Sequence, residues 1–126
     1  MKVKVSGAEG QVLDWMVAKS EGHVVAVAAG GFVVFDTYQD DPPPTNEYND
    51  SRWQCYSPST NWAQGGPIIE REGICLDYWN DDDDLWKADM SGDNEQFGDT
   101  PLIAAMRCYV ASKLGDEVEV PDELLE

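Results

Sequence analysis

The residues best suited to hold a ligand lie in one short segment, from position 56 to position 71 of the 126-residue sequence. The segment combines hydroxyl groups, carboxamides, two aromatic rings, a pair of glycines and a guanidinium. Stacking on an aromatic side chain, with hydrogen bonds from neighbouring polar groups, suits a nucleobase, a ribose or a similar polar ligand. The candidate binding residues are Tyr56, Ser57, Ser59, Thr60, Asn61, Trp62, Gln64, Gly65, Gly66 and Arg71.

In this interpretation Trp62 supplies the stacking surface, Gly65 and Gly66 let backbone amides approach the ligand, and Arg71 pairs with a phosphate or a carboxylate. The same residue types also build turns, because they satisfy backbone hydrogen bonds locally. A packing loop in which Trp62 closes the edge of the core is therefore the alternative, since binding loops and packing loops share this chemistry.

Residues for catalysis are scarce. The sequence has one histidine, His23, and contains no phosphate-binding glycine loop, nucleophile elbow or zinc-binding motif. Its three cysteines, Cys55, Cys75 and Cys108, are widely spaced and odd in number, which favours reduced thiols over disulfides. We therefore expect no enzyme activity, no cofactor and no metal site.

The charge is strongly negative and is concentrated in segments. The chain has 25 acidic and 8 basic residues, a net charge of −17, and 20 of those acids lie in segments 36–50, 77–99 and 116–126. Direct binding to nucleic acid or to an anionic membrane is disfavoured, because both depend on Lys and Arg. No stretch is long and apolar enough to span a membrane, and residues 1–5 lack the apolar core of a signal peptide.

The acidic segments suggest a second hypothesis for the function. If they form one face, the protein could imitate nucleic acid and inhibit a basic host protein, because acidic surfaces steer basic partners. The residues assigned to this role are Asp81, Asp82, Asp83 and Asp84. This run lacks the glycine and glutamate positions of a calcium-binding EF-hand loop, so it is interpreted as solvated charge. A third reading is that the charge only keeps the domain dispersed.

Two helices are expected. An apolar i, i+3, i+4 pattern at Val12, Trp15 and Met16 predicts one that ends at Gly22, with Ser6 and Glu9 at capping-box spacing before it. Thr100 and Pro101 are typical of the start of the second, which ends at Gly115. Its expected apolar face is Leu102, Ile103, Met106, Val110 and Leu114.

Short strands are expected at residues 3–5, in a hairpin of 24–28 with 32–35, and at 52–56 and 74–79. Residues 67–72 fit a short helix or a strand equally well. The predicted fold class is α+β, with a small antiparallel sheet packed against an N-terminal and a C-terminal helix. We expect one domain over 1–115, with acidic loops at 36–50 and 77–99 and an acidic tail at 116–126. A chain trimmed after Gly115, with the two acidic loops neutralised, is expected to remain a folded domain.

Three stretches resemble a known family: LDWMVAK at 13–19 followed by Glu21-Gly22, YSPSTNWAQGGPIIERE at 56–72, and TPLIAAMRCYVASKLGDEV at 100–118. Together they resemble the NinX-like family of tailed-phage and prophage proteins. Residues 14–16 and the acidic insertions around 36–50 and 80–99 are less typical of it. The resemblance implies a small phage accessory protein that acts in the cytoplasm of the infected bacterial host.

Small phage accessory proteins often interfere with host enzymes or host defence, and residues 21–25 are loosely similar to phage proteins that sequester nucleotide immune signals. We therefore expect a non-catalytic binding protein, with a role in counter-defence, that captures a small polar or nucleotide-like ligand through the 56–71 segment. The expected partners are that ligand or a basic host protein. A homodimer would be common for a fold of this kind.

Overall fold

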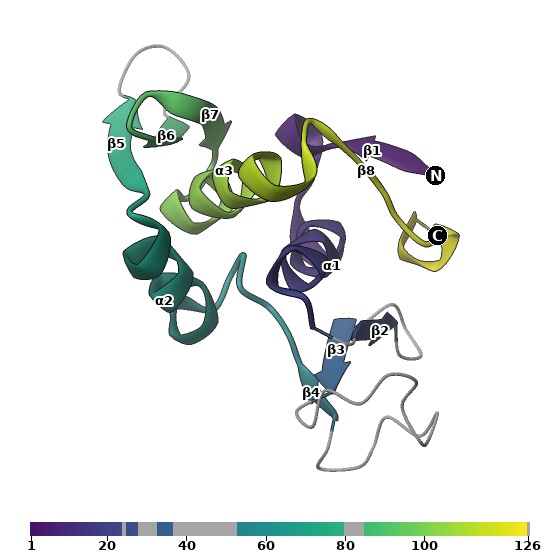
Figure 1. The fold of residues 1–126 in the computed structure, drawn as a ribbon. Helices are drawn as coiled ribbons and strands as arrows, with labels where there is room; N and C mark the ends of the chain where they lie inside the picture. The colour runs from purple at the N-terminus through teal and green to yellow at the C-terminus, as the bar shows by residue number, and fades with distance from the viewer. Residues whose placement is uncertain (24, 28–32, 37–52, 80–84, 126) are drawn as a thin grey trace.

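Helix α3 (Pro101–Leu114) lies at the centre of the protein in the computed structural model, which describes residues 1–23, 25–27, 33–36, 53–79 and 85–125 (Figure 1). The Thr100 hydroxyl accepts a hydrogen bond from the Ile103 amide at 3.1 Å, and Pro101 occupies the first turn, as predicted. Eight α3 residues are buried, and they face several directions around the helix: Leu102, Ala104, Ala105, Met106, Cys108, Tyr109, Val110 and Ala111. A helix buried on several sides is a core helix, which other elements surround.

Helices α1 (Gly10–Glu21) and α2 (Trp62–Glu72) pack beside α3. Helix α1 ends at Gly22 as predicted, because Gly22 has a φ of 79° and donates its amide to the carbonyls of Ala18 and Lys19. Residues 67–72, for which the sequence fitted a helix or a strand equally well, are helical and belong to α2. It begins five residues before Pro67, because the Asn61 side chain caps the Ala63 amide at 2.9 Å.

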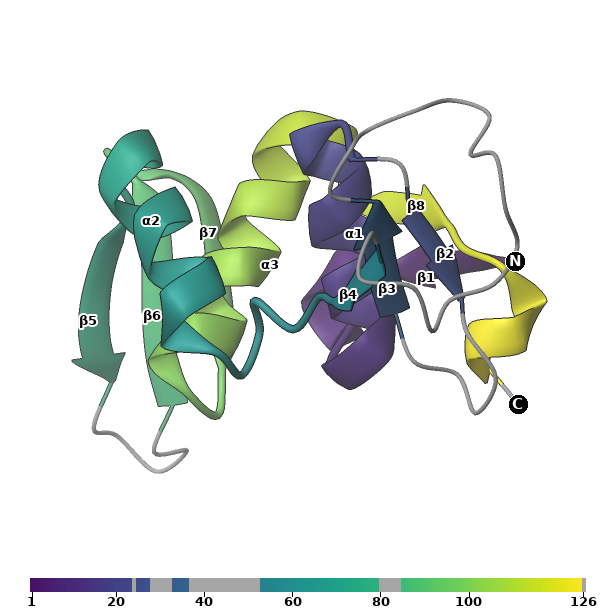
Figure 2. The same cartoon turned by 90° about the horizontal axis from the view of Figure 1, so that it is seen from below.

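Three small antiparallel sheets surround the helices (Figure 2). Strands β1 (Lys2–Lys4) and β8 (Glu117–Glu119) form one, and β2 (Val25–Val27), β3 (Val33–Asp36) and β4 (Trp53–Cys55) form the second. The third has the order β5 (Cys75–Trp79), β6 (Leu85–Met90) and β7 (Asp93–Gly98). The α+β class and the 24–35 hairpin are confirmed, but the predicted single sheet is three sheets.

The predicted acidic loop at 77–99 is wrong over most of its length. Strand β6 alternates between half-buried or buried apolar residues (Trp86, Ala88, Met90) and polar ones (Lys87, Asp89), which is the pattern of a strand with one covered face. Ser91 and Gly92, with φ angles of 55° and 91°, make the tight turn into β7. The density of acids hid this alternation. Residues 81–84, like 37–50 of the other predicted loop, lie outside the described residues.

The predicted acidic tail is also part of the fold. Strand β8 pairs with β1 in the register Val3↔Val118, and the Val5 amide donates to the Asp116 carbonyl at 2.9 Å. Val118 and Val120 are buried, and a 3₁₀ turn follows at Asp122–Leu125. Alternating acids and valines therefore mark a strand whose acids face solvent.

Two local predictions at helix ends are corrected. Ser6 and Glu9 form no capping box, because Ser6 lies in a 3₁₀ turn (Val5–Gly7) that precedes the helix. Helix α1 begins at Gly10, which has a φ of 59°, and Glu9 is its N-cap residue. Leu114 does not join the buried face of α3, because it is 39% exposed in the last turn of the helix.

A chain ending at Gly115 should therefore lose stability rather than fold normally. Removing β8 exposes two buried valines and leaves β1 unpaired, which should cost about 3 kcal/mol or more of unfolding free energy. Thermal melting followed by circular dichroism measures this against the full chain. A full-length Asp116→Asn, Glu117→Gln variant controls for the lost charge. An unchanged, cooperative melt of the truncated chain would show that β8 is dispensable.

Candidate functional site

The beginning of the predicted binding segment belongs to the core. Tyr56 is buried, and its ring centroid lies 5.0 Å from that of Phe35 and 5.3 Å from that of His23. Its amide donates to the Val33 carbonyl at 2.9 Å, which extends the contact between β3 and the end of β4. Tyr56 and the single histidine, His23, thus pack with Phe35 in the β2–β4 sheet.

Most polar groups of the segment bind the segment itself. The Ser57 amide donates to Gln64 Oε1 at 2.6 Å, and Gln64 Nε2 donates to the Cys55 carbonyl at 3.0 Å. The Thr60 hydroxyl lies 3.5 Å from the Ser57 carbonyl, and Asn61 caps α2. These contacts explain the turn-forming residue types as a way to fix the start of α2.

One of the two glycines has a clear structural role. A Cβ atom at Gly65 would lie 2.4 Å from the Pro58 carbonyl oxygen and 2.6 Å from Leu102 Cδ2, so only glycine lets α2 pack this closely. A Cβ atom at Gly66 would lie 3.8 Å from the Trp62 ring, an ordinary contact distance, so packing does not require glycine there.

Below the segment, a buried carboxyl group contacts Ser59. Asp14, which is 5% exposed, accepts a hydrogen bond from the Ser59 amide at 2.8 Å. Burial raises the pKa of Asp14 to about 6, against the lowering effect of its contact with Ser59. The Ser59 hydroxyl is itself buried and has no hydrogen-bond partner among the described residues.

Arg71 is already paired. It donates to both carboxylate oxygens of Glu21, at 3.1 and 2.6 Å, to Glu72 at 2.8 Å and to the Tyr109 hydroxyl at 3.2 Å. Tyr109 donates to Glu21 at 2.5 Å, and Lys113 lies 3.7 Å from Glu72. Burial acts to raise the pKa of Glu21, but the hydrogen bonds from Arg71 and Tyr109 outweigh it and hold that pKa below its usual value. The five side chains tie the ends of three helices together.

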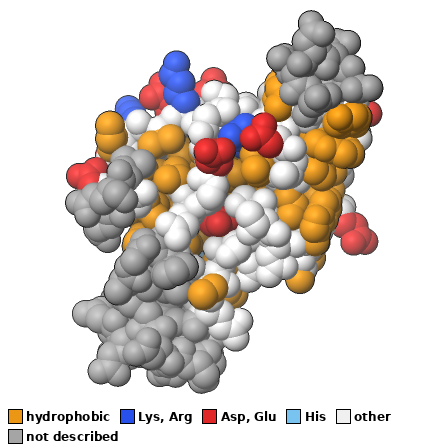
Figure 3. All heavy atoms as spheres, turned by 180° about the vertical axis from the view of Figure 1, so that it is seen from behind, with side chains coloured by type: hydrophobic (Ala, Val, Ile, Leu, Met, Phe, Trp, Pro, Cys, Tyr) orange, Lys and Arg blue, Asp and Glu red, His pale blue; other side chains and the backbone are white. Residues whose placement is uncertain are grey.

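Trp62 is the predicted residue that remains available. It is 54% exposed in the first turn of α2 and borders a pocket of about 200 Å³ between that turn and the beginning of α3. The lining residues are Ser59, Thr60, Trp62, Thr100, Pro101, Leu102 and Ile103. Figure 3 shows hydrophobic side chains gathered on the side of the molecule that carries α2 and β5–β7. Of the ten predicted residues, three meet at this pocket.

Trp62 and Arg71 cannot share a small ligand. They are nine residues apart on one helix, which corresponds to about 13 Å along the axis and about half a turn around it. The stacking surface and the guanidinium therefore point away from each other on opposite sides of α2. The sequence places both groups in one segment, but the helix separates them.

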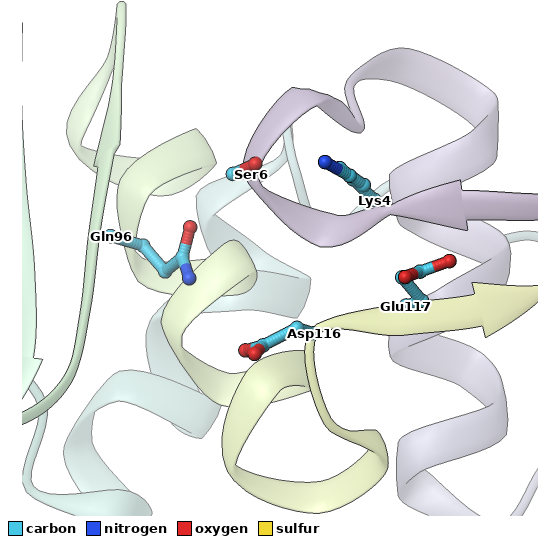
Figure 4. A pocket seen from close by; sticks show the side chains of 5 residues that line it. All are labelled: Lys4, Ser6, Gln96, Asp116 and Glu117. Atoms are coloured by element: carbon cyan, nitrogen blue, oxygen red, sulfur yellow. The ribbon is translucent and has the colours of Figure 1, made fainter.

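A second pocket, of about 330 Å³, was not predicted (Figure 4). It is lined by Lys4, Ser6, Gln96, Asp116 and Glu117, which come from the N-terminal strand and turn, from β7 and from the end of α3 into β8. Its donors and acceptors carry both charges, so they indicate no single ligand chemistry. Sequence patterns could not bring these segments together, because residues 4 and 117 are distant in the chain.

The described residues offer little reactive chemistry. Among them, no three His, Cys, Asp or Glu side chains are grouped so that they could hold a metal ion. The cysteines are free thiols, and burial raises the pKa of Cys108 to about 12, which keeps that thiol protonated near neutral pH. No helix in the described part of the chain is long and apolar enough to cross a membrane.

Comparison with known proteins identifies the protein family, which the geometry alone does not give. The profile of the family described as Bacteriophage P22, NinX matches residues 4–113, which is most of the chain. The chain belongs to this family, as its sequence resemblance implied, and is a phage accessory protein. A search of curated proteins gave no match.

The buried Asp14 should make stability depend on pH. Because its pKa in the folded state (about 6) lies above the ordinary 3.8, the folded state holds this proton more tightly than the unfolded chain. Its contribution to the free energy of unfolding is therefore largest below about pH 4 and falls, by about 2–3 kcal/mol in total, as the pH rises past 6. Urea denaturation across this range, relative to Asp14→Asn, isolates that change from the other acids.

The asparagine variant keeps the oxygen that accepts from Ser59 and removes only the charge. Asp14→Ala removes the acceptor as well and should be less stable at every pH, by about 1–3 kcal/mol. A constant difference between wild type and Asp14→Asn across the pH range would contradict the raised pKa.

Arg71 should matter for stability through Glu21. We expect Arg71→Gln to cost about 1 kcal/mol, because Glu21 loses a bidentate partner in a partly buried position. The same substitution in a Glu21→Gln background should cost clearly less. Urea denaturation of the four proteins of this double-mutant cycle gives the coupling. Equal costs in the two backgrounds would mean that the pair contributes nothing.

Proposed function

We propose that this phage accessory protein is a non-catalytic binding protein that captures one small flat ligand on Trp62, in the pocket between α2 and the beginning of α3. The observation that supports it is an exposed tryptophan at the edge of a preformed pocket. The indole face of an exposed tryptophan can bind a flat ring by stacking.

The size of the pocket limits the ligand. At about 200 Å³ it is smaller than the roughly 300–1,000 Å³ of sites that enclose drug-sized molecules. One ring with a few polar groups fits this volume. Pro101, Leu102 and Ile103 supply apolar contacts, while Thr60 and Thr100 supply hydroxyl groups at the rim.

The electrostatics favour an uncharged or cationic ring. The pocket borders the N-terminus of α3, where anions often bind, but Pro101 has no amide hydrogen and the Ile103 amide is taken by Thr100. Arg71 is bound to carboxylates on the far side of α2. With a net charge of −17 on the chain, a nucleobase or nucleoside suits the site better than a nucleotide.

A role in counter-defence rests on association with the phage family. Capture of a signalling or precursor molecule in the cytoplasm of the infected host requires binding without turnover, and a preformed pocket without catalytic groups suits this use. The second candidate, inhibition of a basic host protein through Asp81, Asp82, Asp83 and Asp84, falls on residues outside the described part of the chain. For this second candidate, Trp62→Ala is expected to leave the capture of the partner protein intact.

Nucleobases and nucleosides should stabilise the protein against heat more than the corresponding nucleotides do. Trp62→Ala should weaken the binding of the best of them by about tenfold or more, because a stacked base is worth about 1–3 kcal/mol. Thermal-shift screening finds the ligand, and isothermal titration calorimetry measures its affinity. Trp62→Phe should retain part of the binding, because it keeps a stacking surface.

Tyr78→Ala is the matched control, because Tyr78 is as exposed as Trp62 (51%) but lies on β5. It should leave ligand affinity unchanged. Mass spectrometry of protein denatured after purification from phage-infected cells tests for a resident ligand. If no small molecule is released and none shifts the melting temperature, the proposal is wrong. Partner capture that survives Trp62→Ala would then favour the acidic inhibitor.

A further inference from the structure

A second exposed apolar surface lies where the C-terminal ends of α1 and α3 meet β8. It borders a hollow of about 330 Å³, lined by Trp15, Lys19, Leu114, Glu117, Val118 and Glu119, and we call it the α1–β8 patch. Leu114 is 39% exposed and Trp15 is half-buried. None of these residues lines the Trp62 pocket. The α1–β8 patch is therefore independent of the proposed ligand site.

Among the large apolar side chains of α3, Leu114 alone is exposed. Its position in the last turn of the helix adds apolar surface to the α1–β8 patch. Trp15 lies close by and carries the Lys19 ammonium 5.6 Å from its ring centroid. Tryptophan is enriched at the centres of protein–protein contacts, so a tryptophan ring beside an exposed apolar side chain fits such a contact.

The charges at the rim of the α1–β8 patch have opposite signs on its two sides. Helix α1 contributes Lys19, which forms no ion pair among the described residues, and β8 contributes Glu117 and Glu119. Glu119 is engaged by the N-terminal amine at 2.7 Å, so Glu117 is the freer carboxylate. The patch thus has a positive edge, an apolar centre and a negative edge.

This arrangement fits a second copy of the same chain. In a twofold contact the same patch faces itself, so the α1 edge of one copy meets the β8 edge of the other. Lys19 then faces Glu117 of the partner copy twice, while Trp15 and Leu114 pack at the centre. A uniformly basic partner would satisfy the glutamates but oppose Lys19. We infer that the protein forms a homodimer through the α1–β8 patch.

The net charge limits the strength of this dimer. Two chains of −17 each repel at long range, but at physiological salt the repulsion is screened beyond about 8 Å, and contacts at the patch act at shorter distance. The dimer should therefore form reversibly and strengthen when salt is raised from low to physiological concentration.

Sedimentation velocity over a range from micromolar to submillimolar protein, at ~0.15 M salt, measures the assembly. We expect a concentration-dependent shift from the 14.0 kDa monomer to a species of twice that mass. Leu114→Glu should abolish it, because it places two more carboxylates at the centre. The substitution is at an exposed position, so the melting temperature of the monomer should change little.

A charge exchange tests the geometry. Lys19→Glu and Glu117→Lys should each weaken dimerisation by about tenfold, and the double variant should recover to within about threefold of the wild type, because the pair is restored in reverse. A 14.0 kDa species at every concentration overturns the inference. It is also overturned if Leu114→Glu still dimerises, if the double variant is no better than the single ones, or if Tyr78→Ser disrupts the dimer instead.

Discussion

The close approach of other elements to α3 is the constraint on which the rest of the structure depends. Gly65 of α2 and Gly98 of β7 both sit where a Cβ atom would clash, Gly65 against Pro58 and Leu102, and Gly98 against the Ala104 amide at 2.7 Å. The buried alanines of α3 have small side chains, which also let neighbouring elements approach the helix closely. Because atoms this close leave no room for rearrangement, the helices and the β5–β7 sheet hold fixed positions around α3.

In this packing the two ends of α2 make different kinds of contact. At its first turn, α2 meets the beginning of α3, and the Trp62 pocket is the space that the capped helix ends leave between them. At its last turn, Arg71 joins Glu21 of α1 and Tyr109 of α3 in one hydrogen-bonded group. The contacts of Arg71 at the last turn orient α2, and thereby also the first turn, which borders the Trp62 pocket. The candidate binding surface at one end of α2 and the ionic contact at the other have no residue in common.

The sequence predicted most elements whose signals are local. Thr100, Gly22 and the β2–β3 hairpin were predicted from capping and turn-forming residue types, whose effects operate within a few residues. Strands β6 to β8 were missed because their acids were counted as loop charge. In β6 and β8, polar and apolar residues alternate, and this period of two was the available signal that net charge obscured. Strand β7 is exposed over its first three residues and has no such alternation.

Which residues of the 56–71 segment line a pocket could be predicted only in part from the sequence, for a physical reason. Residue types showed that the 56–71 segment could bind or could pack, and the deciding fact was which hydrogen bonds each group makes inside the fold. Ser57, Gln64 and Asn61 make theirs within the segment, and Arg71 makes its bonds with carboxylates from elsewhere in the chain. Partners such as Glu21, 50 residues away, follow only from the tertiary structure. No pattern within the segment contains them.

The ion pairs within the protein determine how the net charge of −17 affects a ligand. Arg71, Lys87 and Lys113 each lie within 4 Å of a carboxylate, so much of the positive charge in the described structure is neutralised internally. An anionic ligand would have to displace a carboxylate and approach a negative protein at once. A neutral ring on Trp62 meets neither cost, because stacking and apolar contact do not depend on net charge. The acidity that disfavours nucleic acid as a partner is therefore compatible with the proposed capture of a free base.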